Sequence, residues 1–241
     1  MPKVEGQASR RSGTRILVVG AGIAGLVMAR SLRGHGFALD VVERQPTWSP
    51  AGAGIYLPGN AARALRSLGL EDAVAERSAR ISQQSFGDHR GRVLFEVDVA
   101  EMWRGVGPCL ALHRADLHTV LAGDGDPIEV SMGTSLREIH QQGGTTTAVF
   151  DDDSTEDYDL IIGADGIHST IRQRCFARAG AQPVGRVAWR FVTDCTADLN
   201  AWTVRFGRDV TFLAIPLGRE RAYCYVDSPD LMPARTPPVE Q

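Results

Sequence analysis

Lysine is almost missing from this chain of 241 residues: it occurs only as Lys3, and the other 25 of the 26 basic residues are arginine. A single lysine in the polar N-terminal segment excludes a lysine Schiff base, a catalytic lysine base and the lysine of a P-loop. Net charge is also small, because 29 acidic residues oppose the 26 basic ones and leave a formal charge of −3. This balance argues against nucleic acid as a partner, since binding to phosphates needs a clustered positive face.

Long hydrophobic runs and clustered cysteines are missing as well. The longest apolar run, residues 16–29, contains three glycines and is too short to span a bilayer. The four cysteines lie far apart in the sequence, at Cys109, Cys175, Cys195 and Cys224. We therefore expect free thiols, no metal site, no membrane segment and a cytoplasmic location.

The chain does have enough apolar residues, 43% of the total, to bury a core. Arg15–Val19 is a continuous apolar run of the kind found in strands that are buried on both faces of a parallel sheet. A glycine-rich segment follows, then a helical pattern that stops near Gly34 or Gly36, and then a second strand at Ala38–Val42. These segments predict a βαβ opening.

The rest of the chain alternates between helix and strand patterns. Residues 45–58 predict a loop, and Asn60 is expected to cap a helix that runs to Leu68 and stops at Gly69. Asp151–Asp159 predicts an acidic turn, and Ser169 is the expected N-cap of a late helix. The other expected elements are strands at 81–86, 93–97, 128–132, 135–141, 145–150, 160–164, 186–192, 202–206, 210–216 and 221–226 and a helix at 114–121.

The glycine-rich segment is the first candidate site, with the sequence Gly20-Ala21-Gly22-Ile23-Ala24-Gly25. Gly20 permits the tight turn, Gly22 lets the backbone approach a pyrophosphate, and Gly25 allows close helix–strand packing. The helix start would offer N–H groups to phosphates. Glu43, at the end of the second strand, is placed to accept ribose hydroxyls and would repel a 2′-phosphate. The pattern predicts binding of FAD or NAD and leaves the choice between them open.

A second candidate site is the segment from Tyr158 to Arg172. It predicts a strand, then a turn at Asp165-Gly166, then a helix that starts near Ser169. A carboxylate at the C-terminal end of a parallel strand faces the crevice where ligands bind in such sheets. Taken alone, the same residues favour a plain turn in which Asp165 caps the helix.

Together these motifs resemble the single-component FAD-dependent aromatic-ring monooxygenases, the flavoprotein hydroxylases. The resemblance rests on the glycine motif that continues to Val42-Glu43-Arg44, and on the segment 158–172, which is similar to the family's Asp-Gly motif. Leu112–Leu117 and the loop and helix from Gly52 to Leu70 match in the same order. The later segments 188–190 and 215–218 match the family's substrate strands more loosely.

The resemblance implies a Rossmann-like α/β domain with a three-stranded β-meander and an interleaved, sheet-rich substrate domain. Residues 14–80 and 106–180 would form the FAD domain, and residues 81–105 and 181–228 the substrate domain, between tails at 1–13 and 229–241. FAD would lie against the glycine motif, with Glu43 at the adenosine ribose and Arg44 nearby. Arg114 would reach the phosphates, although it could instead pair with Asp116. Asp165 and Gly166 would contact the flavin.

The implied reaction is hydroxylation of a small aromatic or other electron-rich substrate. In the family, NAD(P)H reduces FAD, and a flavin C4a-hydroperoxide then transfers oxygen from O₂ to the substrate. The cofactor carries the difficult step, which fits the lack of a conventional catalytic triad. Trp189, Arg190 and Tyr223, on the late strands, are candidates to face the substrate or the flavin, and packing within a sheet is the alternative interpretation for each.

The family's third motif, a Gly-Asp segment after the substrate sheet, is not found in this chain. We therefore expect a fragment, a truncated relative, or a chain whose flavin site is completed by a partner or a second copy. Two alternative functions stay open at this point. One is a non-catalytic FAD-binding or scaffold protein of the same fold, and the weaker one is an NAD-linked dehydrogenase.

Overall fold

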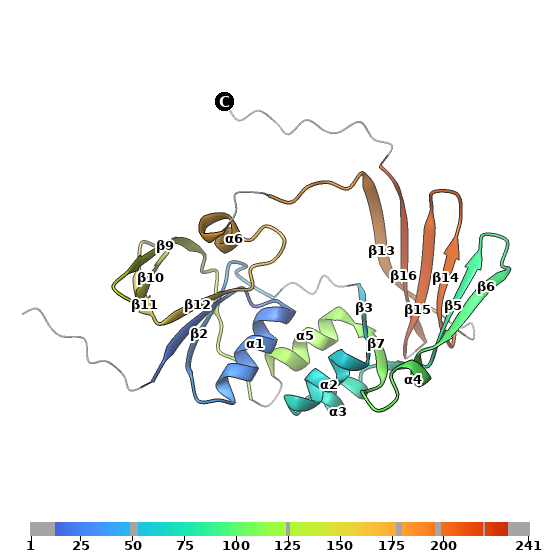
Figure 1. The fold of residues 1–241 in the computed structure, drawn as a ribbon, viewed down its shortest axis with the longest axis horizontal. Helices are drawn as coiled ribbons and strands as arrows, with labels where there is room; N and C mark the ends of the chain where they lie inside the picture. The colour runs from blue at the N-terminus through green and yellow to red at the C-terminus, as the bar shows by residue number, and fades with distance from the viewer. Residues whose placement is uncertain are drawn as a thin grey trace, which may run out of the picture. The chain divides into compact units, whose positions relative to one another are not determined.

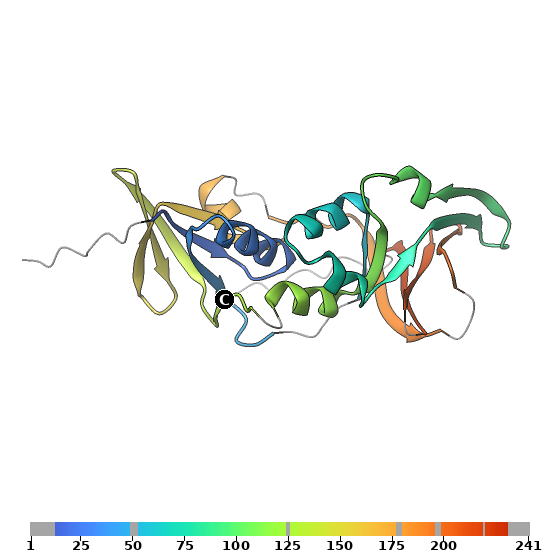
Figure 2. The same ribbon diagram turned by 90° about the horizontal axis from the view of Figure 1, so that it is seen from below.

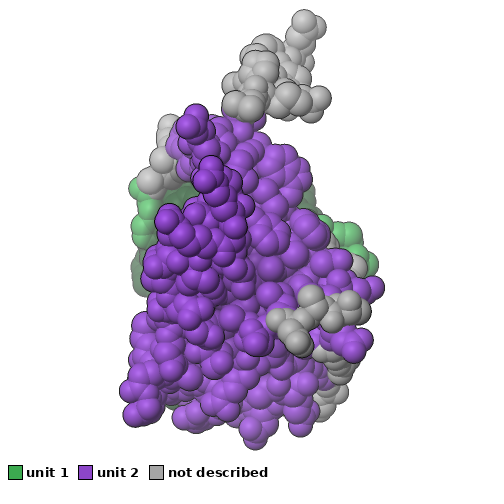
Figure 3. Space-filling model, turned by 90° about the vertical axis from the view of Figure 1, so that its right-hand side faces the viewer, with its two compact units in different colours: residues 1–49, 126–180 green, residues 50–125, 181–241 purple. Residues whose placement is uncertain are grey.

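A computed structural model of the chain describes residues 13–48, 53–123, 126–176, 180–195, 199–218 and 220–230 (Figure 1). The predicted tails, apart from Gly13, Pro229 and Asp230, lie outside these ranges, as does Gly52. The chain divides into two compact units, residues 1–49 with 126–180 and residues 50–125 with 181–241 (Figure 3). This division places 50–80 and 106–125 with the late strands. It reflects backbone packing, and the predicted division into cofactor and substrate domains concerns ligand contacts and stays a prediction.

The first unit is built on a four-stranded parallel sheet. Its order is β12 (Leu160–Gly163), β1 (Arg15–Val19), β2 (Ala38–Glu43) and β8 (Ser131–Met132). Helix α1 (Ile23–Arg33) joins β1 to β2 and packs against both strands (Figures 1 and 2). These three elements confirm the βαβ opening.

Burial differs between the central and the outer strands of this sheet. Leu17 and Val18 of β1 are fully buried, as the continuous apolar run predicts. β12 has only β1 as a neighbour, and Leu160 is 48% exposed. The prediction of a buried strand at 160–164 is therefore right about the strand and wrong about its burial. An apolar run identifies the strand, but the order of strands decides which one lies at the edge.

The second sheet of this unit is the expected three-stranded antiparallel meander. Its order is β11 (Thr155–Tyr158), β10 (Thr145–Phe150) and β9 (Leu136–Gln142), and the turn between β9 and β10 lies at residues 143–144. The predicted acidic turn at 151–159 is wrong over its second half, which forms β11. Tyr158 is buried, and the two acidic side chains of this strand are exposed and have partners: Glu156 accepts from Arg15 at 2.7 Å and Asp157 accepts from Thr147 at 2.6 Å. The predicted strand at 128–132 is shorter, and it joins the parallel sheet as β8.

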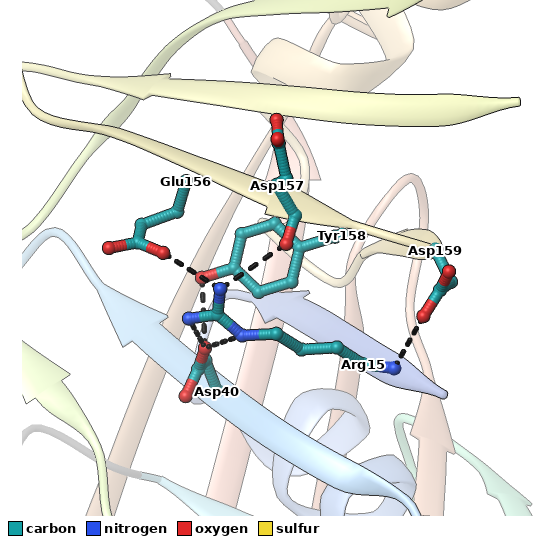
Figure 4. Close-up of polar contacts among 6 residues, drawn as sticks. All are labelled: Arg15, Asp40, Glu156, Asp157, Tyr158 and Asp159. Atoms are coloured by element: carbon teal, nitrogen blue, oxygen red, sulfur yellow. Dashed lines mark hydrogen bonds and ion pairs between the residues drawn. The ribbon is translucent and has the colours of Figure 1, made fainter. Parts of the chain in front are cut away.

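A polar network around Arg15 ties β1 and β2 to β11 (Figure 4). The Arg15 guanidinium donates to Asp40 from Nε at 3.1 Å and from Nη2 at 2.6 Å, and to Glu156 from Nη1 at 2.7 Å. The Tyr158 hydroxyl donates to the same Asp40 oxygen at 3.0 Å, and the guanidinium carbon lies 4.5 Å from the centre of the tyrosine ring. The main-chain N–H of Arg15 donates to Asp159 at 2.7 Å. The network therefore joins the parallel sheet to the meander.

The second unit contains a six-stranded sheet and a smaller three-stranded one. The large sheet has the order β13 (Arg186–Asp194), β16 (Arg221–Pro229), β15 (Thr211–Gly218), β14 (Trp202–Phe206), β5 (Gln83–Asp88) and β6 (Val93–Asp98). The small sheet has the order β3 (Gly54–Leu57), β7 (Cys109–His113) and β4 (Ala79–Ile81). The four late strands and the β5–β6 hairpin confirm the predicted strands, within a few residues at their ends.

Four helices complete this unit: α2 (Gly59–Ser67), α3 (Glu71–Ala75), α4 (Val99–Met102) and α5 (Arg114–Ala122). The predicted N-cap of the first helix is wrong, because Pro58 occupies the cap position and Asn60 lies inside the helix. The predicted loop at 45–58 contains β3, and the predicted strand at 81–86 is split at Ser82. The carbonyl of Ser82 accepts from Val99 and Ala100, where the chain passes from β4 to β5. No helix within the described ranges is long and apolar enough to cross a membrane.

The two sheets of the second unit share one core. Buried residues of β4, β7 and β15 pack together, with half-buried side chains of β3 and β16 against them. The members of this core that are buried are Ile81, Val99, Cys109, Ala111, Ile215 and Leu217. The core therefore holds β3 and β7 against one face of the large sheet, and α5 begins where β7 ends.

Replacing Tyr158 with phenylalanine should change how stability depends on pH. Burial, together with the Asp40 carboxylate, raises the pKa of Tyr158 in the folded protein above its ordinary value of about 10. Above about pH 10 the unfolded chain ionises this phenol while the folded chain still holds the proton, so its contribution to stability is lost as pH rises.

We expect Tyr158→Phe to cost about 1 kcal/mol at pH 7, through the lost hydrogen bond to Asp40. The gap between wild type and variant should then narrow as the pH increases from 9 to 11, as measured by chemical denaturation. Tyr56 and Tyr223, whose pKa values are also raised, stay in the variant and provide the common background. A difference in the free energy of unfolding between wild type and variant that stays constant over this pH range would contradict the raised pKa of Tyr158.

Candidate functional site

The glycine motif and the Asp-Gly motif meet at a close crossing of three backbone segments. Gly20 has φ of +99°, and a Cβ there would lie 2.5 Å from the carbonyl oxygen of Ala164. A Cβ at Gly25 would lie 1.8 Å from the carbonyl oxygen of Gly20. The Ala164 N–H donates to Val19 at 2.7 Å, and the Gly20 N–H donates to Val42 at 2.8 Å. Only glycine at 20 and 25 lets α1 begin this close to the ends of β1 and β12.

The third glycine of the motif is open where the other two are crowded. Gly22 is the N-cap of α1, and a Cβ there would meet nothing within 4 Å. The cap makes no side-chain hydrogen bond, and the first turn of the helix contains no acidic residue. An uncapped helix start presents N–H groups and the positive end of the helix dipole to a ligand. The structure therefore provides an anion-binding helix start with space in front of it.

Glu43 lies beside this turn, at the end of β2. Its carboxylate accepts from the Ala21 N–H through Oε2 and from the Gln45 N–H through Oε1, both at 3.0 Å. Each carboxylate oxygen has a further lone pair, so the group can still accept from a ribose hydroxyl. The two backbone contacts hold the carboxylate at the glycine motif. The neighbouring Arg44 is exposed.

Asp165 follows β12 and caps helix α6 (Thr170–Cys175). Its Oδ2 accepts from Thr170 at 2.6 Å and from Ile171 at 3.2 Å, while Ser169 is the N-cap and accepts from Arg172 at 2.9 Å. The interpretation of Asp165 as a helix cap is therefore correct for one of its oxygens. The other oxygen, Oδ1, is buried and has no hydrogen-bond partner within the described part of the chain.

These features test whether the first unit fits a dinucleotide cofactor. A buried acceptor without a partner costs free energy unless something donates to it. Asp165, which carries this Oδ1, comes two residues after β12, and the end of β12 crosses the glycine turn. The next residue, Gly166, is open, since a Cβ there would meet nothing within 4 Å. An uncapped helix start, a held carboxylate and an orphan acceptor on adjoining strand ends fit a dinucleotide. The structure thus brings the predicted residues of this unit together.

Arg114 belongs to the second unit, where it begins α5. Its N–H donates to the carbonyl of Ala53 at 3.0 Å, and His113 caps the helix by accepting from Ala115 at 3.3 Å. The alternative pairing with Asp116 is not found among the described residues; the carboxylate of Asp116 instead lies 3.9 Å from the guanidinium of Arg221. The Arg114 side chain is exposed and makes no ion pair with any other described residue. A cation at a helix start is unfavourable unless an anion approaches it.

The substrate candidates lie on β13 and β16, and the register of the two strands separates them. Arg190 pairs with Tyr225, and Val192 pairs with Tyr223, so Arg190 and both tyrosines share one face of the sheet. Trp189 is on the opposite face and is 53% exposed. The Arg190 guanidinium carbon lies 5.7 Å from the centre of the Tyr225 ring. Period-2 alternation could have shown from sequence that Trp189 and Arg190 face opposite ways.

The face that carries Tyr223 adjoins the start of β3. A Cβ at Gly54 would lie 2.4 Å from the Cβ of Tyr223, and the residue before Gly54 accepts the hydrogen bond from Arg114. Burial raises the pKa of Tyr223, which keeps its phenol neutral. Arg114, a predicted cofactor residue, and Tyr223, a predicted substrate residue, therefore both lie next to the start of β3. Sequence reasoning missed the roles of Gly54 and Tyr225, because no local pattern connects β3 to β16.

The two glycines Gly25 and Gly22 provide a matched test of the crossing. Gly25→Ala should destabilise the chain by about 3 kcal/mol, because its methyl group would overlap a backbone oxygen that cannot move without shifting the turn. Gly22→Ala should change the free energy of unfolding by less than about 1 kcal/mol, because its Cβ meets open space. Thermal and chemical denaturation measure both. Equal effects of the two substitutions would contradict the geometry.

Comparison with known proteins identifies the family of the chain. A family model described as "FAD binding domain" matches residues 13–226. The chain is 36% identical over 164 residues to 3-amino-4-hydroxybenzoate 2-monooxygenase of Streptomyces cremeus, a match that covers 66% of this chain and 41% of that protein. It is 33% identical over 183 residues to 6-hydroxynicotinate 3-monooxygenase of Pseudomonas fluorescens, covering 74% of this chain and 47% of that protein.

Solved structures show the same fold. Klebsiella pneumoniae HpxO, in a complex with FAD and uric acid, matches with a TM-score of 0.79 and 25% identity, over 92% of this chain and 57% of that one. A substituted variant of the same protein, in complex with FAD, matches with a TM-score of 0.80. The chain spans about half the length of the curated relatives it matches. The family match over most of the chain, together with the crossing of its two motifs, shows that the chain belongs to the FAD-binding family of the flavin-dependent aromatic monooxygenases.

Proposed function

We propose that this chain binds FAD and forms the cofactor and substrate framework of a monooxygenase that uses NAD(P)H and O₂ to hydroxylate a small aromatic substrate. The observation that carries the proposal is the crossing of Gly20, Gly25 and Ala164, which leaves the α1 start open at Gly22. The named relatives, which oxidise an aminohydroxybenzoate and a hydroxynicotinate, support the reaction class.

Each residue of the first unit has a role that follows from its contacts. The N–H groups at the start of α1 would bind the pyrophosphate of FAD, and the carboxylate of Glu43 would accept from the adenosine ribose. Arg44 is exposed next to Glu43 and would lie on the adenosine side. Oδ1 of Asp165 would accept a hydrogen bond from the bound cofactor, and the open space at Gly166 would admit the flavin portion.

The second unit would supply a cation and the substrate face. The unpaired guanidinium of Arg114 would bind phosphate oxygens, which would offset its unfavourable position at the start of α5. Bound FAD supplies the redox chemistry, taking electrons from NAD(P)H and activating O₂. The residues of the protein would bind and orient the cofactor and the substrate and keep water away from them. On the face shared by Arg190, Tyr223 and Tyr225, the guanidinium would hold an anionic or phenolic oxygen of the substrate.

The proposal predicts that the purified chain, reconstituted with FAD, is yellow and that NADH or NADPH bleaches the flavin in the absence of air. Arg114→Ala should weaken FAD binding by about 1–3 kcal/mol, which corresponds to roughly a 5- to 150-fold increase in Kd, because a charge-assisted contact is lost. Flavin fluorescence quenching measures the affinity.

The matched control is Arg90→Ala, which removes an exposed arginine from the β5–β6 turn of the same unit. It should leave FAD affinity unchanged. A chain that is colourless after incubation with FAD and removal of the unbound FAD would refute FAD binding. Equal FAD affinities of wild type and Arg114→Ala would refute the phosphate contact. FAD that binds but is never reduced by either nicotinamide would favour a non-catalytic flavin protein.

If the face with Arg190, Tyr223 and Tyr225 binds the substrate, substitutions at the neighbouring residues Arg190 and Trp189 should differ strongly in their effect on substrate affinity. In the FAD-loaded chain, Arg190→Gln should weaken the binding of 3-amino-4-hydroxybenzoate or 6-hydroxynicotinate at least tenfold, measured as a perturbation of the flavin spectrum. Trp189→Phe should change the affinity less than twofold, since Trp189 points away from that face. A larger effect of Trp189→Phe than of Arg190→Gln would show that the opposite face binds the substrate.

A further inference from the structure

A cavity of about 380 Å³ lies in the second unit, apart from the residues considered so far. It is formed by α2, β4, α4 and the loop at 103–108 that leads into β7. The lining residues that matter for its chemistry are Arg66, Arg80, Arg104, Ile81, Trp103 and Cys109. Its volume is in the lower part of the range of small-molecule sites, which is roughly 300–1,000 Å³.

The lining is positively charged. It contains three arginines from three different elements and no acidic residue. Arg66 pairs with Glu71, with Nη2 at 2.7 Å from Oε1, and Arg104 pairs with Glu101, but neither carboxylate is part of the lining. Arg80 forms no ion pair with any residue in the described ranges. An anion in the cavity would meet one guanidinium without a partner and two more close by.

The floor of the cavity is apolar and firmly held. Trp103, Val106 and Pro108 of the lining are half-buried and offer apolar surface to a ligand, while Ile81 and Cys109 beneath them are only 1% and 2% exposed and support the floor from the core. The loop cannot shift easily, because a Cβ at Gly107 would lie 2.6 Å from the carbonyl oxygen of Gly59, and a Cβ at Gly59 would lie 2.9 Å from Trp103. A preformed apolar floor below a cation suits a ligand with a flat apolar body and one anionic group.

The cavity is separate from the proposed cofactor contact of this unit. Cys109, in its lining, is the first residue of β7, whereas Arg114 follows the last residue of the same strand. At about 3.3 Å per residue, the two positions are roughly 16 Å apart along the chain. The Arg190 face is also distinct, since no residue of β13 or β16 lines the cavity.

We propose that this cavity is a binding site for a small aromatic carboxylate, with the carboxylate on the guanidinium of Arg80 and the ring against Trp103. A planar carboxylate matches the two parallel N–H donors of a guanidinium, and a single ring fits the volume. The proposal does not depend on FAD chemistry, because none of the residues that line the cavity has a role in the proposed flavin site.

The experiment uses benzoate as the probe and the 241-residue chain carrying Arg190→Gln, so that binding at the proposed substrate face does not contribute. Isothermal titration calorimetry should detect one benzoate per chain, and Arg80→Gln in this background should weaken it at least tenfold. The neutral isostere benzamide should bind at least tenfold more weakly than benzoate. Arg90→Gln, an exposed arginine on the β5–β6 turn, is the matched control and should have no effect.

A second variant tests the location without removing a charge. Ala100 lines the cavity and is exposed on α4, so Ala100→Phe should fill the space without disturbing the core, and it should abolish benzoate binding while the thermal midpoint is unchanged. Benzoate affinity that is the same in wild type, Arg80→Gln and Ala100→Phe would overturn the proposal. So would benzoate binding that is lost in the Arg190→Gln background, because the ligand would then occupy the substrate face alone.

Discussion

The close approach of the α1 start to the ends of β1 and β12 is the constraint on which the first unit depends. A side chain at Gly20 or Gly25 would overlap backbone atoms, so the crossing exists only because both positions lack a Cβ. The same crossing brings the residue after β12 to the glycine turn. An open helix start, the Glu43 carboxylate and the orphan oxygen of Asp165 thereby lie around adjoining strand ends, where a dinucleotide can meet all of them.

In the second unit, the main constraint is the packing that holds β7, and the start of α5 after it, beside one face of the large sheet. Its shared core packs β7 against β15, and α5 begins where β7 ends, so Arg114 is positioned by the core although its side chain is exposed. Gly54 lets β3 approach Tyr223 closely. Strand register then decides that Arg190 shares the face of Tyr223 and that Trp189 does not. The proposed cavity lies at the other end of β7, which makes this strand the element common to both sites.

Local patterns predicted most of the elements, and they failed where the outcome depended on distant neighbours. The βαβ opening, α5 and the late strands were recognisable because period and turn residues agree there. β11 was missed because acidic residues suggested a turn, whereas Arg15 and Thr147 on neighbouring strands donate to Glu156 and Asp157. β3 was missed because glycine and proline surround it, yet β7 provides a partner for its hydrogen bonds. Asn60 was misplaced as a cap by two residues, since Pro58 already supplies the extended conformation that precedes the helix.

The sequence by itself indicated the family, the class of cofactor and the candidate cofactor motifs, because the spacing of the glycines, a strand-end carboxylate and the order of the motifs can be recognised locally in the chain. Only the tertiary structure decided that Asp165 caps α6 with one oxygen and leaves the other without a partner. It also decided that Arg114 does not pair with Asp116, and that the face of Arg190 is the one that carries Tyr223 and Tyr225. These outcomes depend on which strands are neighbours and in what register. Pairing between strands that are not adjacent in the chain, such as β1 with β12 and β13 with β16, settles both, and no local pattern encodes such contacts.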